Sequence, residues 1–109
     1  MKPNLLLAAL GALAVCPVFA SAEAADARAG RQKITTCQAC HGLDGLSKNP
    51  EAPNLAGQIE GYLVKALTEY RSGERKNETM NIVARDLTDE DVANTAAFYS
   101  GIQIEVVPP

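Results

Sequence analysis

The stretch Cys37-Gln38-Ala39-Cys40-His41 determines how the rest of the chain is interpreted. It matches the C-x-x-C-H pattern of c-type haem attachment, in which two thiols form thioethers with the haem and the imidazole binds its iron. On a helical turn, residues three and four apart share a face, so Cys37 lies beside both Cys40 and His41. The spacing predicts one covalently bound haem c, held through Cys37 and Cys40, with His41 as an iron ligand.

A C-x-x-C pair also occurs in disulfides, in thioredoxin-like redox sites and in zinc sites. A zinc site needs about four ligands, and the chain has one histidine and, apart from this pair, one cysteine. Thioredoxin-like pairs belong to alternating strands and helices, and the sequence has no such alternation. The histidine directly after Cys40 therefore favours haem attachment.

The first 22 residues are interpreted as a secretory signal peptide. Lys2 gives a positive start, residues 5–15 are apolar or small, and Ala20-Ser21-Ala22 is a small-x-small cleavage site. The apolar run is shorter than the about 20 residues of a membrane-spanning helix, although an uncleaved anchor is the alternative. We expect residues 23–109 to form a single domain in the periplasm, without stable membrane insertion. Export suits the chemistry, because bacterial haem c is attached after the chain has crossed the inner membrane.

Charge and composition narrow the function. The formal net charge of −3 argues against nucleic acid as a partner. The chain has two Phe, three Tyr and no Trp, so a domain of this size has little aromatic bulk for a core. A haem supplies that bulk, and we expect the chain without haem to be largely unfolded.

Three helices are predicted. Residues 26–40 form the first, which ends in the haem motif, places Ile34 in the core and contains Gly30, either for a close helix contact or as a tolerated glycine. Residues 59–72 form the second, and Gly73 ends it. Its apolar stripe includes Tyr62 and Tyr70, which are interpreted mainly as core residues, with contact to haem edge groups as the alternative. The third starts at the N-cap Thr88, followed by three acidic residues, and ends at Gly101.

Two further segments bear on the iron. Residues 42–58 are rich in Gly and Pro and form a loop, in which a backbone carbonyl near Pro53 can accept the ring proton of His41. Residues 73–81 form a polar loop that contains Met80, the only methionine once the leader is removed. Its thioether is the leading candidate for the second iron ligand, and a gap-filling core methionine is the alternative.

Five features in this order resemble class I cytochrome c. They are Cys37 to Gly42, Pro53 to Gln58, Tyr62-Leu63, Gly73 to Lys76 with Met80 following, and Leu87 to Val92. The chain is especially similar to one half of the two-haem cytochromes of the c-four type and to small single-haem bacterial cytochromes, but it has a single haem motif. The resemblance implies an all-α fold, with three main helices and loops wrapped round one covalently bound haem. It also implies that His41 and Met80 bind the iron, that the Pro53 carbonyl supports His41, and that Gly30 meets the Phe98-Tyr99 region.

The ligands predict the function. With His and Met on both axial positions, the iron has no vacant site for a substrate, and the thioether raises its potential. We expect a periplasmic one-electron carrier that is not an enzyme and meets its redox partners through a small, transient interface. Two other functions stay open: a haem subunit of a dehydrogenase or oxidase complex, and a ligand-binding haem protein in which Met80 is labile.

Overall fold

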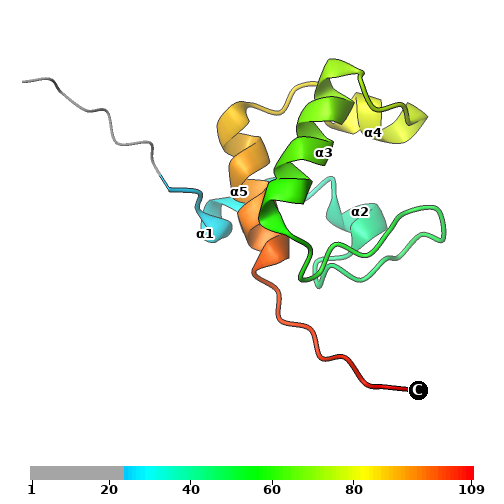
Figure 1. Cartoon of the computed structure of the whole chain (residues 1–109). Coiled ribbons are helices and arrows are strands. Elements are labelled where there is room, and N and C mark those ends of the chain that lie inside the picture. Colours follow the sequence, from blue (N-terminus) through cyan, green and yellow to red (C-terminus); the bar gives the residue numbers. More distant parts are fainter. Residues whose placement is uncertain (1–23) are drawn as a thin grey trace, which may run out of the picture.

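The computed structural model describes residues 24–109, so the predicted signal peptide lies outside the described part. Residues 24–109 form helices and loops and contain no strand. The helices, drawn in Figure 1, are α1 (Ala27–Lys33), α2 (Gln38–His41), α3 (Glu60–Ser72), α4 (Glu78–Val83) and α5 (Asp89–Ser100). The predicted all-α fold is confirmed. None of these helices is long and apolar enough to cross a membrane.

The C-terminal helix α5 is the centre of the packing. Both α1 and α3 pack against it, and α4 packs against α3. Gly30 in α1 is buried directly against Asn94 and Phe98 of α5, so the close helix contact predicted for this glycine is confirmed. In Figure 1, α4 and α2 lie on the same side of α3, one above the other.

A small apolar core lies where α1, α3 and α5 meet. Its buried members are Ile34, Leu63, Ala96 and Tyr99, and Cys37 and Leu55 are partly buried against it. Ile34 is fully buried, as its position one turn before the motif predicted. The core thus reaches directly to the first cysteine of the haem motif.

The predicted ends of α3 and α5 are confirmed. Gly73 ends α3 in the left-handed conformation, with φ 82°, which glycine adopts without a steric penalty. Thr88 caps α5, since its side chain accepts from the Asp91 amide while the Asp91 carboxylate accepts from the Thr88 amide. Asp91 also forms a 2.9 Å ion pair with Lys33, which joins α5 to the end of α1.

Two of the sequence predictions were wrong in detail. Residues 26–40 do not form one helix, because α1 ends at Lys33 and a turn separates it from the four-residue α2. Thr35 and Thr36 lie in that turn, and adjacent β-branched residues are poor helix formers. Residues 73–81 are not entirely loop, because α4 begins at Glu78 and includes Met80.

Candidate haem site

His41 is buried at the end of α2, with 7% of its surface exposed. Its Nδ1 lies 2.8 Å from the carbonyl oxygen of Pro53. A carbonyl only accepts, so Nδ1 carries the proton and Nε2 is left with a free lone pair. The contact that the resemblance implied for Pro53 is therefore present, and it leaves His41 in the tautomer that can bind a metal through Nε2.

The loop between α2 and α3 is folded back so that Pro53 reaches His41. Gly45 has φ 71°, and its carbonyl accepts from the amides of Leu55 and Ala56 at 2.8 and 3.0 Å. At the far end of the loop, the Gly57 amide donates to the Tyr99 carbonyl at 3.0 Å. These bonds fix the position of the Pro53 carbonyl relative to α2.

Cys37 and Cys40 are both free thiols, and both are partly buried. Burial raises the pKa of the Cys37 thiol above its usual range, so the thiol is protonated at neutral pH in the chain without haem. The Cys40 sulfur accepts from the Asn49 side-chain amide at 3.9 Å. Within residues 24–109 neither sulfur is bonded to another cysteine, and both border the same cavity.

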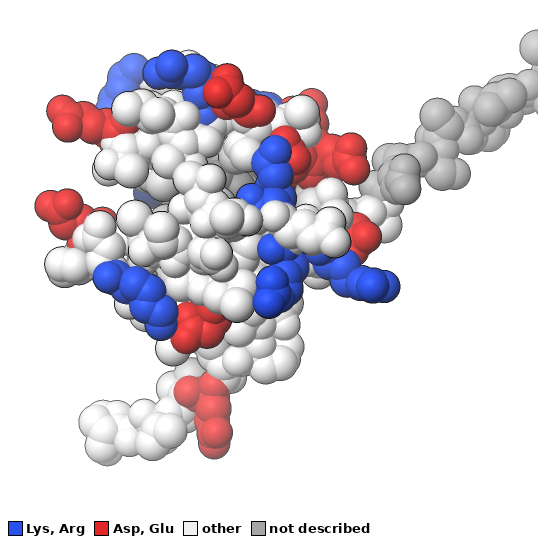
Figure 2. All heavy atoms as spheres, turned by 180° about the vertical axis from the view of Figure 1, so that it is seen from behind, with Lys and Arg blue, Asp and Glu red and all other residues white. Residues whose placement is uncertain are grey.

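The cavity has two sections that share five lining residues. The smaller, of about 100 Å³, extends towards α3 and α5 and is lined mostly by apolar side chains. The larger, of about 380 Å³, lies between α4 and the motif and has Glu51 and Glu78 among its lining residues. The shared residues are Cys37, His41, Pro53, Tyr70 and Met80. Figure 2 shows a hollow in the surface of the molecule seen from behind, with acidic side chains near its edges.

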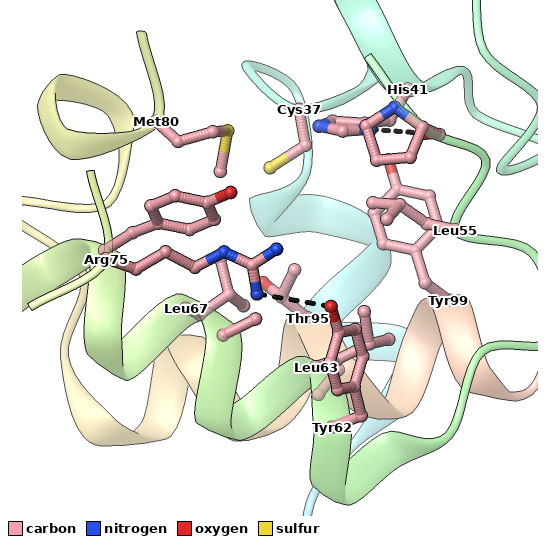
Figure 3. A pocket seen from close by; sticks show the side chains of 14 residues that line it. Cys37, His41, Leu55, Tyr62, Leu63, Leu67, Arg75, Met80, Thr95 and Tyr99 are labelled. Carbon is pink, nitrogen blue, oxygen red and sulfur yellow. Dashed lines mark hydrogen bonds between the residues drawn. The ribbon is translucent and has the colours of Figure 1, made fainter. Parts of the chain in front are cut away.

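Met80 and His41 enter the cavity from opposite sides. In Figure 3 the Met80 sulfur and the His41 ring point towards one another across it, with Cys37 between them. The position of Met80 is fixed by two asparagines. The Asn77 side chain accepts from the Met80 amide at 2.9 Å, and the Asn81 amide group donates to the carbonyls of Tyr70 and Arg75 at 2.7 and 2.8 Å. The backbone that carries the thioether is thus held at the start of α4 by local capping and by a tie to α3.

Several lining residues were not identified from the sequence. Tyr62 and Tyr70 border the cavity, as their alternative role at the haem edge requires, and Tyr62 is 44% exposed, so the preferred assignment of Tyr62 to the core was wrong. The Arg75 guanidinium lies over the Tyr70 ring, 5.0 Å from its centre, and donates to the Tyr62 hydroxyl at 3.2 Å. Hydrogen bonding to Tyr62 raises the pKa of Arg75. Among the described residues Arg75 is the only cation that lines the cavity.

Thr95 is a further lining residue that was not identified from the sequence. It is 4% exposed, lines the smaller section, and its hydroxyl is the one buried side-chain oxygen or nitrogen in residues 24–109 without a partner. Buried hydroxyls are nearly always hydrogen-bonded. A lone Thr on the inward face of α5 gives no sequence signal for this, because the sequence does not show whether its hydroxyl bonds to the carbonyl one turn before it, to a distant segment or to the contents of the cavity.

The residues present fit a haem c. Two thiols at C-x-x-C spacing border a largely apolar slot, and one imidazole and one thioether enter it from opposite sides. Residues 24–109 contain no group of three or more His, Cys, Asp or Glu side chains placed to hold a metal ion. Single His and Met ligands suit an iron whose other positions are filled by a porphyrin. The free Nε2 of His41 could bind the iron, and the Arg75 cation, which lines the slot, could pair with the carboxylates of a haem.

Comparisons with known proteins give the family. A family model described as cytochrome c matches residues 27–102. The chain is 49% identical over 80 residues to cytochrome c-554(548) of Halomonas halodenitrificans, covering 71% of this chain and 96% of that one. It is 41% identical over 83 residues to cytochrome c4 of Pseudomonas aeruginosa, covering 76% of this chain and 41% of the other.

Solved structures agree. The crystal structure of reduced recombinant cytochrome c4 from Pseudomonas stutzeri superposes with a TM-score of 0.69 at 39% identity, over 73% of this chain and 47% of that one. The chain therefore spans less than half the length of these cytochrome c4 proteins and nearly all of cytochrome c-554(548). The resemblance predicted from the sequence is confirmed: the chain belongs to the cytochrome c family of haem-based electron carriers, with one covalently bound haem c as its cofactor.

Proposed function

We propose that this protein is a periplasmic one-electron carrier whose haem is bound covalently through Cys37 and Cys40 and ligated by His41 and Met80. The observation that carries the proposal is the placement of the His41 ring and the Met80 sulfur on opposite sides of one cavity (Figure 3). Two side chains that approach from opposite sides suit the two axial positions of a planar macrocycle.

His41 is prepared for this role by its hydrogen bond. The Pro53 carbonyl, 2.8 Å from Nδ1, accepts the ring proton and leaves Nε2 as the ligating atom. Such a bond fixes the orientation of a metal-bound histidine and raises its basicity. Pro53 thus contributes to haem binding through its backbone.

Met80 is held by the cap of α4. Its backbone amide is bound by Asn77, and the following Asn81 is tied to the end of α3, so the backbone that carries the thioether is fixed on both sides of Met80. When bound, the haem supplies one-electron chemistry at its iron, and a thioether ligand favours the reduced form. A protein side chain on each axial position leaves none for a substrate, which supports a carrier.

Export and partners belong to the same proposal. We assign residues 1–22 to a signal peptide and residues 23–109 to the mature single domain, which acts in the periplasm. Its donor and acceptor are redox proteins that dock transiently, through an interface at the small end of the observed range. The hollow between the motif and α4 is the natural approach to the haem (Figure 2).

The first experiment is mass spectrometry of the mature protein. A mass equal to residues 23–109, within a few residues at the start, plus one haem supports the cofactor and the processing together. A mass of the polypeptide alone contradicts the whole proposal. Cys37→Ala and Cys40→Ala should each remove one thioether and sharply lower the yield of holoprotein, and His41→Ala should prevent maturation.

The ligand on the other side is tested by Met80→Ala. We expect covalent haem to remain, the reduction potential to fall, and the far-red absorption band of methionine-ligated oxidised iron to disappear. Ile82→Ala is the matched control, because Ile82 lies on the same short helix and is 64% exposed. A potential unchanged in Met80→Ala would refute the ligand assignment. Rapid carbon monoxide binding by the reduced wild-type protein would instead favour a ligand-binding haem protein.

A further inference from the structure

Tyr99 in α5 makes two hydrogen bonds to the loop that follows the haem motif. Its hydroxyl donates to the Gly42 carbonyl at 3.0 Å, across 57 positions of sequence, and its own carbonyl accepts from the Gly57 amide at 3.0 Å. The side chain is 1% exposed. Burial raises the pKa of Tyr99, so the hydroxyl stays protonated and able to donate throughout the physiological pH range.

The two bonded glycines stand at the two ends of one loop. Gly42 directly follows His41, and Gly57 ends the stretch that begins at Pro53. Both have positive φ, 81° and 67°, so the chain turns sharply at each end. A Cβ at position 42 would lie 2.3 Å from the Leu46 carbonyl oxygen, which leaves the turn no alternative conformation with a larger residue. One residue of α5 therefore fastens both ends of the segment that carries the acceptor for His41.

We infer that Tyr99 is a positioning residue for His41: by holding Gly42 and Gly57 it sets the direction of the imidazole and of its Pro53 acceptor towards the iron. The inference rests on the proposed role of His41 as an iron ligand. Figure 3 shows the Tyr99 ring beneath His41, on the same side of the cavity. Tyr99 does not itself bind the iron.

A core residue that only fills space would behave differently. Gly42 is buried, so without the Tyr99 hydroxyl its carbonyl is left unpaired or the turn must move to reach water. Any such movement is passed to His41, its neighbour in the chain. Loss of the hydroxyl should therefore change the iron site and not stability alone.

The test compares Tyr99→Phe with Ile34→Val in the holoprotein. Both positions are buried in the same cluster, but Ile34→Val removes only a methyl group and touches neither glycine. Paramagnetic NMR of the oxidised protein reports the orientation of the axial histidine through the haem methyl shifts, and a redox titration gives the potential. We expect Tyr99→Phe to reorder or displace the haem methyl shifts and to move the potential, while Ile34→Val leaves both as in the wild type.

Equal spectra and potentials in the wild type and in Tyr99→Phe would overturn the inference, as would equal changes in the two variants. If Tyr99→Phe yields no holoprotein, the test is made on the wild-type holoprotein, by measuring how fast the Tyr99 hydroxyl proton exchanges with solvent. Slow exchange, with the proton in contact with Gly42, supports the inference. Rapid exchange overturns it. Failure of the proposed function is recognised separately, by absence of haem from the wild-type mass or of the methionine band from its spectrum.

Discussion

The backbone of Gly30 in α1 lies so close to Asn94 in α5 that a Cβ at position 30 would be 2.0 Å from the Asn94 carbonyl oxygen. The same atom would be 2.9 Å from the Phe98 Cβ. Neither distance is tolerated, so Gly30→Ala must push the two helices apart. Overpacking of this kind costs about 3 kcal/mol. We expect a loss of that size in the free energy of unfolding of the holoprotein, measured by denaturant titration with circular dichroism.

Gly61 in α3 provides the matched control for that substitution. A Cβ there meets no atom within 4 Å, and the residue is exposed. Alanine is the better helix former by up to about 1 kcal/mol, so Gly61→Ala should leave stability unchanged or raise it slightly. Equal effects of the two substitutions would show that α1 and α5 do not cross at Gly30.

Asp91 joins the start of α5 to the end of α1, so loss of its carboxylate should lower the stability of the protein at neutral pH. Its carboxylate accepts from the Thr88 amide at 3.0 Å and pairs with Lys33 at 2.9 Å. Asp91→Asn keeps an acceptor for the amide but removes the charge. We expect a destabilisation of about 0.5–1 kcal/mol at pH 7, from thermal unfolding of the holoprotein.

The same variant has a defined pH dependence. The hydrogen bond from the Thr88 amide, with a smaller effect of Lys33, lowers the pKa of Asp91 in the folded protein. A carboxyl with a lowered pKa stabilises the fold above its unfolded pKa of about 3.9, and this stabilisation is lost as pH falls through the folded value. The stability difference between wild type and Asp91→Asn should thus be constant above about pH 5 and shrink below about pH 4. A difference that grows on acidification would contradict the assignment.

The buried Thr95 hydroxyl predicts a destabilising substitution. No protein group in residues 24–109 pairs with it, it lines the cavity, and buried hydroxyls are nearly always hydrogen-bonded. We therefore expect the bound haem, or a water beside it, to pair with this hydroxyl in the holoprotein. Thr95→Val, which has nearly the same shape, should then lower the unfolding temperature of the holoprotein, since a lost hydrogen bond costs about 0.5–1.5 kcal/mol. A rise would instead show that the hydroxyl has no partner.

Much of the fold was predictable because its signals are local. Thr88 followed by three acidic residues marked the start of α5, Gly73 marked the end of α3, and Ile34 was placed in the core by its spacing from the motif. Each depends on residues within about one helical turn. The five site residues proposed from the sequence all line one cavity, and they are Cys37, Cys40, His41, Pro53 and Met80.

The parts that were missed depend on distant contacts. The Asn81 side chain donates to the carbonyls of Tyr70 and Arg75, and the Tyr99 hydroxyl donates to the Gly42 carbonyl, 57 positions away. No periodicity in the sequence predicts these hydrogen bonds. The helix that carries Met80 did leave a local signal, since Asn77 stands where an N-cap would. Charged and polar residues surround this segment, and a helix of six residues is too short to show an apolar stripe. The sequence therefore favoured a loop.

The approach to the haem predicts how the protein reacts with small redox reagents. Glu51 and Glu78 line the larger section of the cavity, and no Lys or Arg among the described residues does. Both carboxylates are exposed, so their field extends about one Debye length into solution, roughly 10 Å at 0.1 M salt. An anionic oxidant is repelled there and a cationic one is attracted. The rate of oxidation by ferricyanide should therefore rise with ionic strength, and the rate with a tris-chelate cobalt(III) cation should fall.

Glu51→Gln makes that prediction specific. Removing one charge beside the cavity should raise the ferricyanide rate by about two- to fivefold at low ionic strength and lower the rate with the cation, by stopped-flow at matched potentials. Both effects should fade as salt is added. Glu105→Gln removes the same charge from the C-terminal tail, which does not line the cavity, and should change neither rate. If Glu105→Gln changes the two rates as strongly as Glu51→Gln, the oxidants respond to the total charge of the protein and not to a charge beside the cavity. Electron transfer through the face that carries Glu51 would then be contradicted.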